Sequence, residues 1–169
     1  MPVVEITPNT LRPASLRSVL EIASGELLAR GRARGVEQGN AYAGSLYPPE
    51  AWALAEAGAV TLVDVRTAEE LKYVGRVPGS AHVAWQTGPA LIKNPRFLRE
   101  LENKAGRDQV LVLLCRSGKR SAAAARAATE AGFTQVFNVL EGFEGDLDGQ
   151  RQRGDTGGWR HWGLPWVQD

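Results

Sequence analysis

The chain has 169 residues, of which 43% are hydrophobic and 23% charged, and its 20 basic and 19 acidic side chains leave a formal net charge of +1. A chain of this length can build one domain with its own core, and its balanced charge argues against nucleic acid or an anionic membrane as the main partner. Because Cys115 is the single cysteine, an intrachain disulfide and a multi-cysteine zinc site are excluded, and we expect no metal or organic cofactor.

Residues 1–45 are expected to form an N-terminal extension with one helix. Residues 1–13 contain three prolines and predict an irregular chain without the apolar stretch of a signal peptide. Apolar side chains at helical spacing predict a helix that follows Ser15 as its N-cap. Three arginines near the end of this helix suit the helix dipole, and we interpret them as solvated rather than as a binding patch. The three are Arg30, Arg32 and Arg34. The glycine-rich residues 35–46 predict a linker.

Residues 46–150 show strand patterns that alternate with helical patterns. The expected helices cover residues 48–58, 67–75, 94–106 and 120–132. The expected strands cover residues 59–65, 81–85, 110–115 and 135–140. Such alternation indicates parallel pairing. We therefore predict an α/β domain whose central parallel sheet is flanked by helices on both sides.

Residues 151–169 form a tail rich in glycine and arginine that carries three tryptophans, Trp159, Trp162 and Trp166. Tryptophan rings in such a tail bury large apolar surfaces, so we expect them to pack the tail on the domain. The alternative is that they form a surface for a partner.

The sequence "LLCRSGKRS" at residues 113–121 places Cys115 at the end of an apolar strand. A lone cysteine in such a strand is normally inert core, but ligands of α/β sheets bind at the carboxyl ends of strands. The loop that follows leads directly into a helix, so its amide N–H groups and the helix dipole favour an anion there. Three cations lie in the same loop, and Gly118 suits a tight turn. These features favour a thiolate, and the thiolate is the nucleophilic form.

This loop resembles the active-site loop of the rhodanese family of sulfurtransferases. "LVDVRTAEEL" at residues 62–71 is similar to the family's Asp-x-Arg segment, and "GRVPGSAHV" at residues 75–83 resembles its segment before the second core strand. "VFNVLEGFEG" at residues 136–145 is similar to a later family segment, with Phe143 where the family often has a second glycine. The four segments occur in family order, and the resemblance implies a central parallel sheet flanked by helices.

The resemblance implies that Cys115 takes sulfur from a small anionic donor such as thiosulfate, holds it as a persulfide, and passes it to cyanide or a thiol. Arg116 and Lys119 are the expected contacts of the donor, and Ser117 and Gly118 contribute amides of the same loop.

Arg120 is expected either to contact substrate with the rest of the loop or to brace the loop by pairing with an acidic group such as Asp64. Arg66 is expected to serve in either of these roles. The resemblance thus implies that Asp64 and Arg66 support the site.

Two other readings stay open. A persulfide carrier in a protein sulfur relay would dock its partner on the N-terminal helix or on the tail. A cysteine phosphatase or arsenate reductase is less favoured, because its signature has five residues between cysteine and arginine, whereas four separate Cys115 from Arg120 here. Without a signal peptide or an apolar run long enough to span a membrane, a cytoplasmic location is expected.

Overall fold

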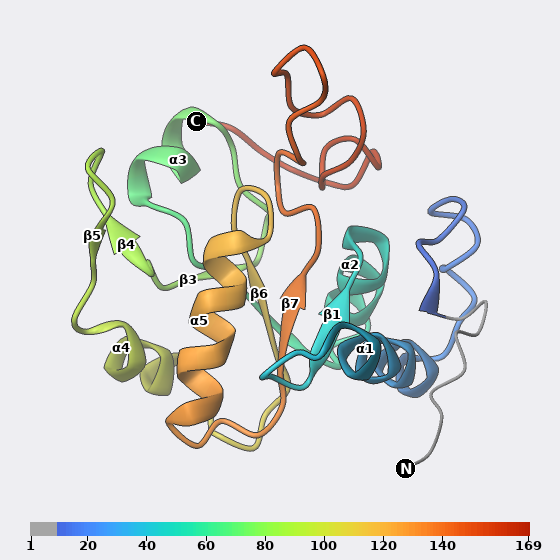
Figure 1. Ribbon diagram of the computed structural model, residues 1–169, viewed down its shortest axis with the longest axis horizontal. Helices are drawn as coiled ribbons and strands as arrows, with labels where there is room; N and C mark the ends of the chain where they lie inside the picture. Colours follow the sequence, from blue (N-terminus) through green and yellow to red (C-terminus); the bar gives the residue numbers. More distant parts are fainter. Residues whose placement is uncertain (1–9) are drawn as a thin grey trace.

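Residues 10–169 are described by the computed structural model, so the irregular segment expected over residues 1–13 lies largely outside the described part of the chain. Five strands form one sheet in the spatial order β1–β7–β6–β2–β3, and every neighbouring pair runs parallel. The strands are β1 (Gly44–Leu46), β2 (Thr61–Asp64), β3 (Ala81–His82), β6 (Leu111–Leu114) and β7 (Val136–Val139). Their carboxyl ends therefore meet at one edge, which is the upper edge in Figure 1.

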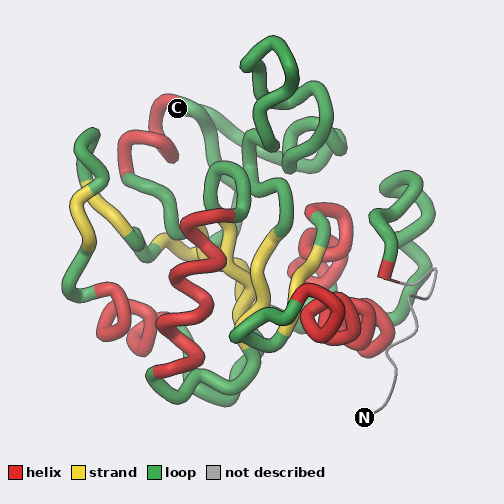
Figure 2. The backbone as a smooth tube through the Cα atoms, viewed as in Figure 1, coloured by secondary structure: helices red, strands yellow, loops and turns green. Residues whose placement is uncertain are grey.

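Helices cover both faces of this sheet, as Figures 1 and 2 show, so the predicted fold class is confirmed. The helices are α1 (Ser24–Gln38), α2 (Pro48–Glu56), α3 (Ala68–Tyr73), α4 (Phe97–Lys104) and α5 (Lys119–Glu130). Val112 and Leu114 of β6 join the core under α1 and α2, whereas Leu111 and Leu113 join the core under α4 and α5. This division follows from the alternation of side chains along a strand. Within residues 10–169, none of the helices is long and apolar enough to cross a bilayer.

A short antiparallel hairpin, β4 (Gln86–Thr87) paired with β5 (Ile92–Lys93), was not predicted from the sequence. Strands of two residues offer too few positions for an alternating pattern. The side chain of Ile92 is also exposed, so the hairpin has no buried apolar face that would produce a strand pattern in the sequence.

The linker expected over residues 35–46 is wrong, because α1 continues to Gln38 and β1 pairs with β7. The glycines that suggested a linker instead allow close packing. A Cβ at Gly44 would lie 2.2 Å from the carbonyl oxygen of Gly31 in α1. Glycine is needed there because the helix backbone approaches the edge strand directly. The sheet thus takes part of its edge strand from the expected extension, and β1 spans the expected boundary at residue 46.

The helix of the extension begins at Ser24, nine residues after the expected N-cap Ser15. Between these points the chain makes i to i+3 turns, such as the bond from the Val19 N–H to the Leu16 carbonyl at 3.0 Å. Ser15 and Ser18 bond to each other's backbone, because the Ser18 N–H donates to Ser15 Oγ at 3.2 Å and Ser18 Oγ donates to the Ser15 carbonyl at 2.7 Å. Such local bonds compete with a continuous helix.

Arg34 is buried, so its interpretation as a solvated helix-end cation is wrong. Its guanidinium donates to both carboxylate oxygens of Glu50 in α2, at 3.0 and 3.2 Å, and to the carbonyls of Ser45 and Thr10 at 2.7 and 2.9 Å. A buried cation requires such partners. Arg34, which lies in α1, therefore joins this helix to the preceding chain at Thr10, to β1 and to α2.

Residues 151–169 run without a helix or an extended strand along the upper side of the domain (Figure 2). Trp159 is buried in the same core as α1 and α2, and its indole N–H donates to the Pro165 carbonyl at 2.9 Å. Val167 forms an antiparallel bridge with Arg76. Trp166 stacks edge-on against Phe143 at 6.3 Å between ring centroids. The tail therefore packs against the segment that supports the Cys115 loop.

Candidate active site

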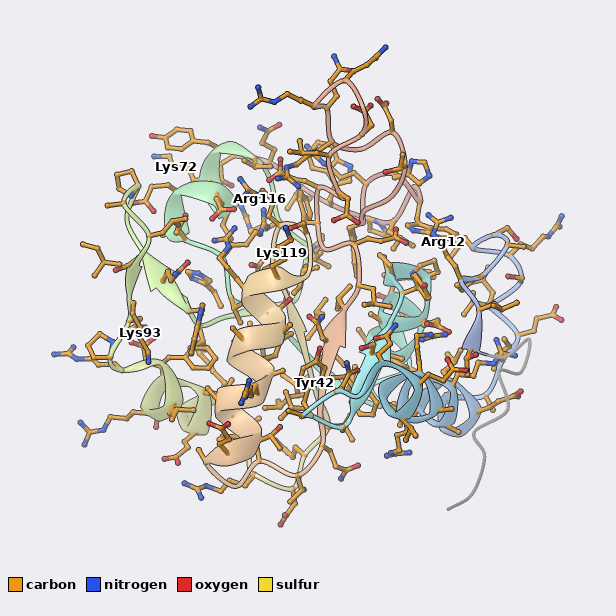
Figure 3. All side chains as sticks on the ribbon, in the orientation of Figure 1. Arg12, Tyr42, Lys72, Lys93, Arg116 and Lys119 are labelled. Atoms are coloured by element: carbon orange, nitrogen blue, oxygen red, sulfur yellow. The ribbon has the colours of Figure 1, made fainter. Side chains whose placement is uncertain are left out.

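Cys115 follows β6 directly and begins a loop that leads into α5, at the edge where the strands end (Figure 1). Gly118 is the N-cap of α5 with a φ of 99°, a left-handed conformation that favours glycine. In Figure 3 the labelled side chains of Arg116 and Lys119 lie together above the first turn of α5. The loop, the strand end and the helix N-terminus thus converge as the sequence predicted.

Cys115 is 1% exposed, and its sulfur has two polar neighbours. The Gly118 N–H donates to Sγ at 3.1 Å, and the hydroxyl oxygen of Ser121 lies 3.2 Å from Sγ. Ser121 is buried in the first turn of α5 and was not predicted as a site residue. Its position one residue beyond the cationic loop is the sequence feature that could have identified it.

The carbonyl groups of the loop are held by donors outside it. The Cys115 carbonyl accepts from the Phe143 N–H at 2.8 Å, and the Arg116 carbonyl accepts from the Glu144 N–H at 2.9 Å. The chain between these donors and β7 lies very close to the loop, because a Cβ at Gly142 would sit 2.5 Å from the Arg116 carbonyl oxygen. The segment after β7 therefore fixes the orientation of the loop peptides.

The amide groups of the loop are left largely free. In the part of the chain that the structure describes, the N–H groups of Ser117, Lys119 and Arg120 have no protein acceptor. Unpaired N–H groups at a helix N-terminus favour an anion, and the helix dipole adds to this effect. A single amide, that of Gly118, contacts the sulfur itself among residues 10–169; the others are available to a group bound beyond it.

Arg116 and Lys119 are both exposed and form no ion pair within the described residues. They provide two unneutralised cations at the mouth of the loop. A cavity of about 390 Å³ adjoins this loop, with Ser117, Gly118 and Lys119 on one side and Tyr47 and Glu141 among the residues that face them. A small anion in this cavity would meet Lys119 and the residues of the loop that carry free amides.

Arg120 pairs with an acidic group, as expected, but the partner is Glu70 and not the suggested Asp64. Its guanidinium donates to both carboxylate oxygens of Glu70 in α3, at 2.7 and 2.8 Å. Glu70 also completes the capping box of α3, because its carboxylate accepts the Thr67 N–H at 3.3 Å while the Glu70 N–H donates to the Thr67 side chain at 3.2 Å. This bidentate pair ties the loop end of α5 to α3.

Asp64 pairs instead with Arg66, and both side chains are 0% exposed. The shortest contact joins Arg66 Nη2 to Asp64 Oδ2 at 2.7 Å, and Nη2 also donates to the Gly75 carbonyl at 2.8 Å. Arg66 stacks on the ring of Phe143 at 4.3 Å, which gives a packing role to the aromatic that replaces the family's second glycine. Because Arg66 is enclosed, it supports the segment under the loop rather than the open rim.

The Glu70–Arg120 pair predicts a pH-dependent stability. Burial opposes ionisation of Glu70, but the hydrogen bonds and charge of Arg120, with the Thr67 N–H, outweigh it and lower the pKa of Glu70 from its usual 4.5. The folded state thus binds this proton less tightly than the unfolded state, so the stabilisation is present above that value and is lost as pH falls through the lowered pKa.

We therefore expect Glu70→Gln to reduce the free energy of unfolding by about 1 kcal/mol at neutral pH. In urea titrations the difference from wild type should shrink as the pH is lowered below 4.5 and through the lowered pKa of Glu70. A difference that stays constant or grows in acid would contradict the proposed ionisation of Glu70.

Among residues 10–169 no three side chains of histidine, cysteine, aspartate or glutamate are grouped in a way that could hold a metal ion.

Comparison with known proteins places the loop in context. The sequence profile of the rhodanese-like domain matches residues 47–147. An uncharacterized protein of Rickettsia rickettsii is 34% identical over 111 residues, which are 62% of this chain and 80% of that protein. Thiosulfate sulfurtransferase 16, a chloroplastic protein of Arabidopsis thaliana, is 34% identical over 83 residues, 48% of this chain and 68% of that protein. The crystal structure of Rv0390 from M. tuberculosis is 43% identical, covers 76% of this chain and 99% of that one, and has a TM-score of 0.68.

Proposed function

The chain belongs to the rhodanese-like family, and from that membership we propose that it is a sulfurtransferase that carries sulfane sulfur as a persulfide on Cys115. The observation that carries the proposal is the place of Sγ. It lies at the end of β6, contacted by the Gly118 N–H, beside loop amides that have no acceptor in the described chain. A second sulfur attached to Sγ would carry a negative charge, and such amides stabilise negative charge.

With thiosulfate as donor, the reaction is two displacements at sulfur. The Cys115 thiolate attacks the outer sulfur, a new S–S bond forms, and the S–S bond of thiosulfate breaks with its electron pair leaving on sulfite. Cyanide then attacks the outer sulfur of Cys–S–S⁻, departs as thiocyanate and returns the thiolate. A thiol in its thiolate form would accept the sulfur in the same way. Covalent catalysis of this kind divides one difficult transfer into two easier ones.

The two rim cations, Arg116 and Lys119, are proposed to meet the anionic donor. Ser117 and Gly118 belong to the same proposed site through their amides, and Arg120 holds the loop through Glu70. The proposed support comes from Arg66, which stacks on Phe143, and from Asp64, which pairs with Arg66. A reduced thiol is needed throughout, so a reducing compartment such as the cytoplasm is part of the proposal. The proposed acceptor in the cell is a small thiol or a protein in a sulfur relay.

Mass spectrometry of the intact protein tests the first step. After incubation with thiosulfate and removal of the excess, the wild-type chain should gain the mass of one sulfur atom, and cyanide should remove that mass with release of thiocyanate. Cys115→Ser should gain nothing, because no other thiol is present.

A wild-type protein that gains no sulfur from thiosulfate, polysulfide or an organic persulfide would overturn the sulfurtransferase proposal. Sulfur gained from a persulfide but not from thiosulfate would retain sulfur transfer and reject thiosulfate as the donor.

A further inference from the structure

The hydroxyl of Ser121 lies between two groups that both need its proton. Its oxygen is 3.2 Å from Cys115 Sγ and 2.5 Å from Oδ1 of Asn138, which is on β7. All three side chains are buried. A serine hydroxyl has one proton to donate, so it cannot donate to the sulfur and to the amide oxygen at the same time.

The orientation of the Asn138 amide is set by the catalytic loop. Nδ2 of Asn138 donates to the Gly118 carbonyl at 3.1 Å. Rotating the amide by half a turn would place Oδ1 against that carbonyl oxygen, and two acceptors would then face each other. Oδ1 therefore faces Ser121 and acts as an acceptor there.

The three chemical states of Cys115 use this proton differently. In the thiol state, S–H donates to Ser121 Oγ and the Ser121 hydroxyl donates to Asn138, so every group has a partner. In the thiolate state, Ser121 must turn to the sulfur to stabilise the charge, and Asn138 loses that bond. In the persulfide state the charge lies on the outer sulfur, so Sγ is a weak acceptor and Ser121 can return to Asn138.

From this count of protons we propose that Asn138 is a positioning residue that competes with the Cys115 thiolate for the Ser121 hydroxyl. The inference rests on the proposed persulfide function. Asn138 then favours the thiol and persulfide states over the free thiolate, which limits the unproductive reactivity of the empty site and favours retention of the carried sulfur.

The Tyr42 phenol is a further polar neighbour of Asn138. Burial raises the pKa of the Tyr42 phenol above its usual 10.0, and hydrogen bonds with Ser45 and Asn138 oppose that rise. The phenol is therefore neutral near pH 7. When Ser121 turns to the sulfur, Asn138 keeps the bond from its Nδ2 to the Gly118 carbonyl, so the buried amide retains a partner.

A double-mutant cycle tests the inference through the rate at which iodoacetamide alkylates Cys115 near neutral pH. Asn138→Leu leaves the Ser121 proton to the sulfur, so alkylation should be about three- to tenfold faster than in wild type. Ser121→Ala removes the donor, so alkylation should be slower by a similar factor. In Ser121→Ala/Asn138→Leu the acceleration caused by leucine should disappear, because no proton is left to release.

The matched control is Asn94→Leu. Asn94 is also a buried asparagine with a bond to a carbonyl, that of Ala84 at 2.9 Å, but it lies near α4 and makes no contact with Ser121 or Cys115. It should lower thermal stability without changing the alkylation rate. If Asn138→Leu does not yield folded protein, Asn138→Ala replaces it.

An alkylation rate that is unchanged or reduced by the Asn138 substitution would overturn the inference. The same acceleration with and without Ser121 would also overturn it, because the effect would then come from loop opening. Neither result would affect the gain of sulfur by the wild-type protein, which tests the proposed function separately.

Discussion

Cys115→Ser is expected to reduce thiocyanate formation from thiosulfate and cyanide to the rate of the uncatalysed reaction. A serine hydroxyl is not ionised near neutral pH, and oxygen at this position cannot form the sulfur–sulfur bond on which both steps depend. The loop should keep its shape, because its carbonyls are held by Phe143 and Glu144 and do not depend on the sulfur.

The measurement is steady-state colorimetric detection of thiocyanate, with unfolding curves to show that the variant is folded. Lys119→Ala and Arg116→Ala are the comparison variants. Each removes one exposed cation without an ion pair in the described chain, so each should raise the KM for thiosulfate and retain part of kcat. A serine variant that keeps more than a trace of wild-type turnover would mean that another group accepts the sulfur.

The sheet and its site could be predicted because their signals are local. The apolar run Leu111–Leu114 needs burial on both faces, and only a central strand provides it. The position of Cys115 at the end of this run, followed by a helix, places it at the edge where ligands bind. None of this depends on knowing which distant residue lies nearby.

The missed features depend on tertiary contacts. Arg120 and Glu70 are separated by 50 positions, and no sequence pattern distinguishes Glu70 from Asp64 as the partner of an arginine. Glycine is common in linkers, and it also occurs in strands that lie directly against a helix, so the sequence around Gly44 fits both. The structure distinguishes them, because a Cβ at Gly44 would lie 2.2 Å from the Gly31 carbonyl oxygen. Ser121 and Asn138 meet at the site because α5 packs against β7, and this contact has no signal in the sequence around either residue.

The buried pair of Asp64 and Arg66 carries the largest expected effect on stability. Asp64→Ala should lower the free energy of unfolding by about 3–5 kcal/mol, because it leaves the Arg66 charge enclosed without its carboxylate. The Gly75 carbonyl would be the remaining hydrogen-bond partner of the guanidinium among residues 10–169, since Nη1 already lacks one there. The loss can be measured by urea denaturation followed by tryptophan fluorescence.

Two further variants separate a buried-charge effect from a general loss of packing. In Asp64→Ala/Arg66→Met the uncompensated charge is gone, so the double variant should be more stable than Asp64→Ala alone. Glu130→Ala breaks the exposed pair with Arg126 and should change stability by no more than about 0.5 kcal/mol. A double variant less stable than Asp64→Ala would contradict the buried-charge argument. Because Arg66 stacks on Phe143, whose N–H holds the Cys115 carbonyl, Asp64→Ala should also lower turnover in the protein that remains folded.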